Sequence, residues 1–379
     1  MPTIISTSYY VSLNGSCKLN GAQAVLSELT KRATRRPIIR AVAIVSICTP
    51  VLVACSFCVF LALGALRDFS YSQPILFPNS QAIILALLDP VAVLGVAIFV
   101  LGLEWLILKD NRENASIFRL VRSNNPSVRR DIFFFLLRMS GLHKALTLAM
   151  SLGAGWYINN VIQSHLGWSL LANANLVTQF IVVIIVHSFF AYWSHRILHS
   201  SALWNVHKLH HTAESMNAIT ALRTHPFSYF FADIFSAAPL AILGADIFVI
   251  LIYIIFFDAI WNYIIHSQID WRLGWLGKHV LVTPGYHAIH HSIDPEHYNS
   301  NYSVTLIFWD RLFGTQYKGQ IPPISEIKIG VEDGHKHNEG LVLSMLFNVW
   351  YLWCHETVKW FSNLPQRCLK LCNQLGSKF

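Results

Sequence analysis

The chain has 379 residues, of which 54% are hydrophobic and only 13% are charged, and its formal net charge is +8. The mean hydropathy of +0.45 lies well above that of an ordinary soluble domain, so the composition argues against a soluble globular protein. The basic excess does not require a nucleic-acid partner, because basic loops beside anionic lipid headgroups give the same balance.

A basic N-terminal segment, residues 1–40, precedes a series of apolar segments. The first of these, 41–66, has no charged residue in 26 positions. That length is enough for a helix to cross a hydrocarbon core of about 30 Å. Three further apolar segments follow at 90–108, 139–158 and 176–193. We therefore predict an all-α polytopic membrane protein with about four transmembrane helices, and we assign 41–175 to an N-terminal transmembrane region.

The positive charges alternate between the expected loops. Six Lys and Arg residues precede the first span and six lie in the loop 109–132, whereas the loop 67–82 holds one and the loop 161–175 holds none. Cytoplasmic loops of membrane proteins carry this excess of Lys and Arg. We therefore predict that the N-terminus is cytoplasmic and that the chain returns to the cytoplasm after residue 193.

Two shorter apolar stretches, 227–243 and 247–265, are separated by Gly244-Ala245-Asp246. This pattern predicts a helical hairpin, and each arm is at the short limit for a complete crossing. The remaining segment, 319–379, is expected to hold a surface loop followed by an interfacial helix at 341–361 that is rich in aromatic residues.

Eight of the 18 histidines form three short motifs: His195-x3-His199, His207-x2-His210-His211 and His287-x2-His290-His291. Residues three and four positions apart share one helix face, so each motif directs its imidazoles to one side. Imidazole is the commonest nitrogen ligand for iron, copper and zinc. One ion rarely needs more than four or five such ligands, so the eight histidines predict two ions. A closed structural zinc site would need only four.

The order and spacing of these motifs resemble the fatty acid hydroxylase / sterol desaturase superfamily of membrane di-iron oxygenases. The flanking segments agree with it: Tyr192-Trp193-Ser194 before the first motif, Arg223-Thr224-His225-Pro226 after the second, and Asn301-Tyr302 through Trp309-Asp310-Arg311-Leu312-Phe313-Gly314-Thr315 after the third. The resemblance covers about residues 180–318, and we assign 176–318 to a catalytic domain.

The resemblance implies a cytoplasmic site with two iron ions (Fe2+/Fe3+) that uses O2 as co-substrate. It implies that the eight motif histidines are catalytic, and it adds His225 and His266, which occupy positions where relatives carry histidine. The predicted metal ligands are His195, His199, His207, His210, His211, His225, His266, His287, His290 and His291.

The implied activity is a monooxygenase that hydroxylates or desaturates a membrane lipid: a sterol or hopanoid, an acyl chain, an ether lipid or an aminolipid. The sequence shows no motif for a dinucleotide, ATP, haem or an iron–sulfur cluster, so electrons would come from a separate ferredoxin- or cytochrome-type system. A non-enzymatic metal-binding protein, such as a transporter or sensor, is the alternative. Transporters place ligands near the bilayer midplane, whereas these motifs follow the end of a span.

Other polar residues in the apolar segments have several open interpretations. His187 lies two turns before His195 on the same helix face, where relatives often carry an acidic residue, and could support a ligand, touch substrate or only pack. Asp233 and Asp258 lie on opposite arms of the hairpin and could line a polar path. The seven histidines expected to be structural or at the surface are His143, His165, His279, His297, His335, His337 and His355.

Overall fold

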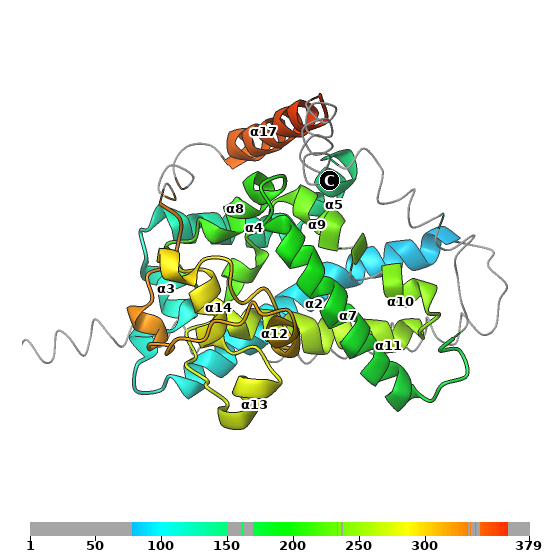
Figure 1. The fold of residues 1–379 in the computed structure, drawn as a ribbon, viewed down its shortest axis with the longest axis horizontal. Coiled ribbons are helices and arrows are strands. Elements are labelled where there is room, and N and C mark those ends of the chain that lie inside the picture. Colours follow the sequence, from blue (N-terminus) through cyan, green and yellow to red (C-terminus); the bar gives the residue numbers. More distant parts are fainter. Residues whose placement is uncertain are drawn as a thin grey trace, which may run out of the picture. The chain divides into compact units, whose positions relative to one another are not determined.

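The structure is a computed structural model that describes residues 78–150, 161, 170–232, 234–235, 238–332, 334, 338 and 342–362. In this part of the chain the regular elements are helices, and β-structure is limited to two isolated bridges (Figure 1). The predicted all-α class is therefore confirmed for the described residues. The predicted first span, 41–66, lies outside them.

Two described helices are long and apolar enough to cross a membrane. They are Pro90–Ile107, within α2 (Pro78–Ile107), and the whole of α7 (Leu176–Leu198). α7 begins after the N-cap Asn175, whose side chain accepts a hydrogen bond of 2.9 Å from the Thr178 amide. The helix continues past the predicted end of the span at residue 193, and this extension carries His195 on a regular helical turn.

The predicted third span, 139–158, is described only in part. α4 (Pro126–Met139) ends where that span was expected to begin, and Gly141 then adopts a φ of +71°. Such a left-handed conformation favours glycine and turns the chain into α5 (Leu142–Met150). Residues 151–158 lie outside the described part of the chain, so the length of this segment stays a prediction.

The predicted hairpin is present as two helical arms. The first contains α9 (Pro226–Ala232) and α10 (Ala238–Ile242), and the second contains α11 (Ile247–Ile252), the π-helix η5 (Tyr253–Asp258) and α12 (Ala259–Ile265). Between the arms Gly244 has a φ of +67°, and the Asp246 amide donates a 2.7 Å hydrogen bond to Gln179 of α7. α10 and α11 both pack on α7.

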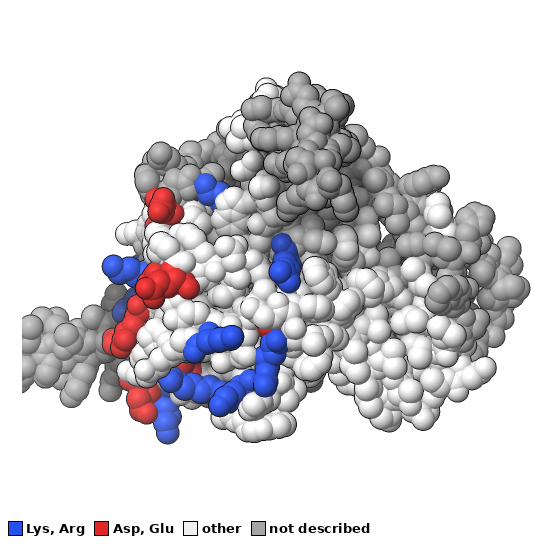
Figure 2. Space-filling view, in the orientation of Figure 1, with Lys and Arg blue, Asp and Glu red and all other residues white. Residues whose placement is uncertain are grey.

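The charge pattern of the surface separates this apolar part from the rest. In Figure 2 the surface over α10, α11 and the start of α7 shows no charged side chain, whereas basic and acidic side chains gather on the part that carries α3 and α13. α3 spans Ser116–Arg122 and α13 spans Gly274–His279. The uncharged surface suits hydrocarbon, and the charged one suits water or headgroups.

Two buried clusters hold the helices that carry the first two histidine motifs and His266. One joins α4, α7 and α9 to α8 (Trp204–His211) and α17 (Val342–Ser362). The other joins α2 and α12 to the 3-10 helix η3 (Ala218–Leu222). The remaining elements are η1 (Arg112–Asn114), α14 (Pro284–His290), η6 (Pro295–His297), α15 (Phe308–Leu312) and η7 (Ile324–Glu326). α17 supplies the predicted C-terminal helix, and its contact with a membrane stays a prediction.

Candidate metal centre

Four short stretches of helix bring the predicted ligands together. His195 lies in the last turn of α7 and His199 is its C-cap, while the three histidines of the second motif lie on α8. His266 is the C-cap of α12. α14 begins with Thr283 at the N-cap and Pro284 at the first helical position, an arrangement that starts a helix sharply. The third motif thus lies on one and a half turns of helix and its C-cap.

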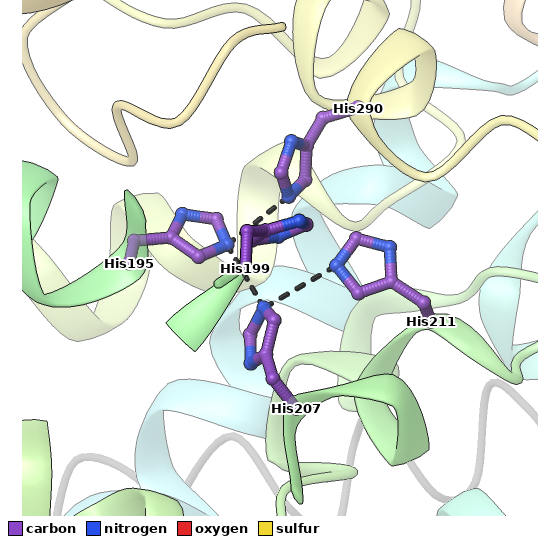
Figure 3. Close-up of side chains that lie close together, drawn as sticks. All are labelled: His195, His199, His207, His211 and His290. Carbon is purple, nitrogen blue, oxygen red and sulfur yellow. Dashed lines mark hydrogen bonds between the residues drawn. The ribbon is translucent and has the colours of Figure 1, made fainter. Parts of the chain in front are cut away.

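The histidines form two groups, each able to hold one ion. The first group contains His195, His199, His207, His211 and His290 (Figure 3). The second group contains His210, His266, His287 and His291. Within each group the potential ligand atoms all lie within 4.8 Å of one another. Nine of the ten histidines predicted as ligands are therefore brought together.

The spacing of the ring nitrogens fits coordination of a shared ion. In the first group His207 Nε2 lies 3.1 Å from His195 Nε2 and 3.3 Å from His211 Nε2. In the second group His287 Nε2 lies 2.9 Å from His266 Nε2 and 3.1 Å from His291 Nε2. Two nitrogens that each lie about 2.1 Å from one ion are about 3.0 Å apart at a right angle and about 3.4 Å apart at the tetrahedral angle.

One pair in the first group shows which ring nitrogens carry protons. His195 Nδ1 lies 2.6 Å from the Tyr302 carbonyl oxygen, and His290 Nδ1 lies 2.8 Å from the Ser300 carbonyl oxygen. A carbonyl oxygen only accepts, so each Nδ1 carries and donates a proton. In the neutral rings both Nε2 atoms then present lone pairs, and these two atoms face each other at 3.0 Å.

The second group repeats this arrangement. His266 Nδ1 donates to the Asn262 carbonyl at 2.7 Å and His210 Nδ1 to the Arg223 carbonyl at 3.3 Å, while their Nε2 atoms are 3.3 Å apart. Facing lone pairs repel unless a cation lies between them. Burial lowers the pKa of His210, and that of His290 in the first group, well below the usual value of 6.5, so protonation is disfavoured at neutral pH. A metal ion is the cation that fits.

The loop 299–303 holds the carbonyls that orient the first group. Asp310 accepts hydrogen bonds from the Tyr302 and Ser303 amides at 2.8 and 2.9 Å and from the Thr315 hydroxyl at 2.7 Å. Asn301 adopts a φ of +59°, and its side chain joins the Tyr286 carbonyl to the Tyr317 amide. Sequence analysis included Asp310 in the resemblance but assigned it no role. Its signal in the sequence is an acidic residue in the short helix α15 that follows this loop.

Arg223 holds the backbone that orients a ligand of the second group. Its guanidinium is fully buried, lies 3.2 Å from Asp131 of α4, and donates to the Leu209 and Thr212 carbonyls on the α8 side. Its own carbonyl orients His210. Burial lowers the pKa of Arg223, and the Asp131 carboxylate opposes that shift. The buried ion pair fixes the chain between the second motif and the hairpin.

His225 lies outside both groups. Its Nδ1 accepts a hydrogen bond of 3.2 Å from the Phe227 amide, and its Nε2 donates to the Leu346 carbonyl of α17 at 3.1 Å. Both ring nitrogens are therefore engaged away from the two groups. Burial lowers the pKa of His225 to about 4, so the ring is neutral. In this arrangement it connects the start of α9 to α17.

The histidines expected to be structural also lie outside both groups wherever they are described. His297 packs its ring against Tyr317, at a centroid distance of 4.9 Å. His143 and His279 contact the arginines Arg138 and Arg311, and His355 stacks on Tyr351. His165, His335 and His337 lie outside the described residues.

Two cavities reach the histidine groups. The first, about 380 Å³, has mainly apolar walls and touches both groups, through His195 and His207 of the first and His210, His266 and His287 of the second. We call it the apolar cavity. The second, about 520 Å³, touches only first-group histidines, His199, His211 and His290, and its rim carries Lys208, Tyr298 and Glu332. We call it the polar cavity.

Comparison with known proteins supports the resemblance found in the motifs. The chain is 35% identical over 125 residues to alkylglycerol monooxygenase of Xenopus tropicalis, a match that covers 33% of this chain and 27% of the relative. It is 32% identical over 152 residues to the ornithine lipid hydroxylase OlsE of Rhizobium tropici, covering 40% and 45%. A very-long-chain aldehyde decarbonylase of Oryza sativa subsp. japonica is 25% identical over 178 residues, covering 42% and 28%.

These matches cover less than half of this chain and less than half of each relative. The chain spans about a quarter of the length of the alkylglycerol monooxygenases and under half of OlsE. No solved structure matches. The fatty acid hydroxylase family profile matches residues 180–315, which include all nine histidines of the two groups and Asp310. Residues 180–315 therefore belong to the fatty acid hydroxylase family.

Proposed function

We propose that this protein is an iron- and O2-dependent hydroxylase of a membrane lipid, with desaturation as a variant of the same chemistry. The two histidine groups would each hold one iron. The observation that carries the proposal is the facing pair of unprotonated Nε2 atoms in each group, at 3.0 and 3.3 Å. His195 of the first pair and both rings of the second pair line the apolar cavity. Buried neutral imidazoles suit a redox-active ion, and an apolar cavity suits a hydrocarbon substrate.

Two irons bound by imidazole would supply the redox chemistry for O2 activation and oxidation of an unactivated C–H bond. The residues of this chain prepare the site for it. Carbonyl acceptors keep protons on Nδ1 of His195, His290, His210 and His266, so that Nε2 of each ring is free to bind metal. The apolar walls exclude water from the side on which a lipid would lie.

A separate donor would supply the electrons, since nothing in the sequence predicts a nucleotide, haem or iron–sulfur site. The polar cavity favours approach of such a donor to the first group, because charged side chains line its rim and the ligands His199, His211 and His290 reach it. A ferredoxin- or cytochrome-type protein has the required chemistry. We place this side of the protein in the cytoplasm from the distribution of Lys and Arg.

The substrate class follows from the apolar cavity and the names of the relatives. Alkylglycerol monooxygenase and ornithine lipid hydroxylase are named for lipids with a polar headgroup, and the aldehyde decarbonylase for a very long chain. A lipid with a long hydrocarbon part and a polar group fits all three names. The uncharged surface over α10, α11 and the start of α7 would give such a lipid access from the bilayer (Figure 2).

The direct test is the metal and product content of the detergent-purified protein. We expect close to two irons per chain, and O2 uptake with a reductant and ferredoxin that yields a lipid heavier by one oxygen. The lipid is found by comparing the lipids of cells with and without the gene. A protein that holds one tightly bound zinc, or that binds iron but consumes no O2 with any extracted lipid, would favour the transporter or sensor alternative.

The topology can be tested separately with reporter fusions. Fusions after residues 125, 215 and 320 should report a cytoplasmic position and a fusion after residue 75 an external one. An external reporter at residue 215 would place the histidine groups away from cytoplasmic electrons and contradict the proposal.

A further inference from the structure

Two helical segments, one in α7 and one in the second arm of the hairpin, each present side chains to the apolar cavity at every fourth residue. On α7 the lining residues include His187, Ala191 and His195, and on the second arm of the hairpin they include Asp258, Asn262 and His266. Residues four positions apart share a helix face, so each arm forms one continuous wall. Each series ends at a histidine of one metal group and begins at a polar residue about 12 Å away along the helix axis.

The two starting residues form a polar cluster at the far end of the cavity. His187 Nδ1 lies 3.2 Å from the Tyr253 hydroxyl and 3.9 Å from Asp258 Oδ1, and Thr305 donates to that same Oδ1 at 3.1 Å. Tyr253 and Thr305 are almost fully buried. The Asp258 side chain keeps 23% of its surface exposed and lines the cavity. A carboxylate has about four acceptor sites, so it can accept further hydrogen bonds here.

The local backbone supports a binding site at this place. Residues Tyr253–Asp258 form a π-helix between the α-helical segments α11 and α12. Such turns are rare and occur frequently at functional sites. This one begins at Tyr253 and ends at Asp258, two members of the polar cluster. Ala191, between His187 and His195, leaves open the space from the cluster to the metal ligands.

We propose that His187 and Asp258 bind a hydroxyl group of the lipid substrate and thereby determine which carbon lies beside the metal centre. A hydroxyl can donate to Asp258 and also pair with the His187 ring. A carboxylate or phosphate would be repelled by the Asp258 carboxylate. A plain hydrocarbon would form no hydrogen bond with the remaining acceptor sites of Asp258. This inference rests on the proposed lipid hydroxylase function. It adds that the oxidised carbon lies roughly 12 Å from the bound hydroxyl.

Binding of matched twelve-carbon probes tests the inference without turnover. The full-length, iron-loaded protein in detergent is kept without O2 or reductant, and Kd is measured from tryptophan fluorescence for 1-dodecanol, dodecane, dodecanoate and dodecylammonium. A twelve-carbon chain spans roughly 14 Å at about 1.2 Å per bond, enough to reach from the cluster to the ligands. Dodecanol should bind at least about 10-fold more tightly than the other three, as expected for a hydrogen bond to a charged group.

Variants test whether the preference for dodecanol depends on His187 and Asp258. His187→Leu and Asp258→Leu should reduce the dodecanol preference to less than about 3-fold, with dodecane binding unchanged. Ser188→Ala is the control: Ser188 is the next residue of α7, accepts a 3.0 Å hydrogen bond from Trp309 Nε1 and does not line the cavity. It should keep the full preference. If a leucine variant does not fold, Tyr253→Phe removes only the hydroxyl that contacts His187 and should still weaken the preference.

The outcomes separate this inference from the proposed function. Equal binding of dodecanol and dodecane to the unchanged protein, or a full dodecanol preference in both leucine variants, would overturn it. Tighter binding of dodecylammonium than of dodecanol would overturn the assignment to a hydroxyl. If the preference behaves as expected but no lipid is ever oxidised, the binding site stands and the hydroxylase proposal fails. With turnover established, the His187→Leu product should carry its new oxygen at more than one carbon.

Discussion

The two histidine groups differ in how far they are enclosed. All four residues of the second group are buried, whereas His199 of the first is half-buried. The polar cavity reaches the first group only, and the apolar cavity reaches both. The comparison indicates that the two ions would have different roles: one enclosed ion would hold the site together, and one would be accessible to water and to an electron donor.

The largest expected effect distinguishes the groups directly. His266→Ala leaves three histidines in the enclosed group, fewer than a stable four-ligand site needs, so activity should be abolished and iron should fall to about one per chain. His199→Ala leaves four histidines in the open group, so activity should be low but measurable and iron should stay above that of His266→Ala. The measurement is iron per chain beside product formation. Equal losses in both variants would show that enclosure does not distinguish the two sites.

A smaller effect is expected from the residues that orient the ligands. Asp310→Asn places an amide NH2 where an oxygen now accepts hydrogen bonds, which frees the Tyr302 carbonyl and so the His195 ring. Activity should fall by about 10–100-fold, with iron lost mainly from the first group. Asp294→Asn is the control, because Asp294 caps the short helix η6 and contacts neither group. Iron loss from the second group instead would contradict the link between Asp310 and His195.

The sequence predicted which histidines come together far better than it predicted the groups that support them. Spacing in the three motifs was sufficient for eight histidines, because ligand spacing on a helix is a local property. The partition was not predictable: His210 and His211 are adjacent in sequence but belong to different groups, since neighbouring positions on a helix point about 100° apart. The carbonyls of Tyr302, Asn262 and Arg223 were also missed, because any residue provides a carbonyl and only the fold aims it.

The predicted spans also show that sequence patterns do not predict tertiary contacts. The span 176–193 appears within α7, but α7 continues to the histidines because nothing in 194–198 stops a helix. Glu104 lies in the apolar segment 90–108. It is fully buried and accepts hydrogen bonds from the Ser116 and Gln268 amides at 2.8 and 2.6 Å, and so ties α2 to the chain after His266. Hydropathy shows where a segment is apolar and gives no information about such partners.

Acid should weaken the metal-free protein and remove metal from the loaded one. Burial lowers the pKa of His207, His211, His287 and His291 well below 6.5 in the folded chain. Below pH 6.5 the unfolded chain therefore binds protons that the folded chain does not, so stability is full above that pH and is lost as pH falls towards the folded pKa values. The apparent Tm in detergent should fall steadily from pH 7 to pH 5. A Tm that is constant over this range would mean that the rings are not buried and neutral without metal.

The smallest expected effect concerns His225, which lies two residues after Arg223 and close to the second group in sequence. In this structure its two hydrogen bonds join the Phe227 amide to the Leu346 carbonyl, so His225→Ala should loosen α17 without removing a ligand. Two lost hydrogen bonds of about 1 kcal/mol each would lower stability modestly, and activity should fall by less than about 10-fold with two irons retained.

Limited proteolysis provides the second measurement for this variant. Cleavage near α17 should be faster in His225→Ala than in the unchanged protein, because the Leu346 carbonyl loses its buried partner. His297→Ala is the matched control, since its ring packs on Tyr317 away from both groups and from α17, and neither iron content nor cleavage should change. Loss of one iron in His225→Ala would instead show that this ring turns to a metal when the site is filled. The second group would then have five histidines, like the first, and the contrast between an enclosed four-ligand site and an open five-ligand site would disappear.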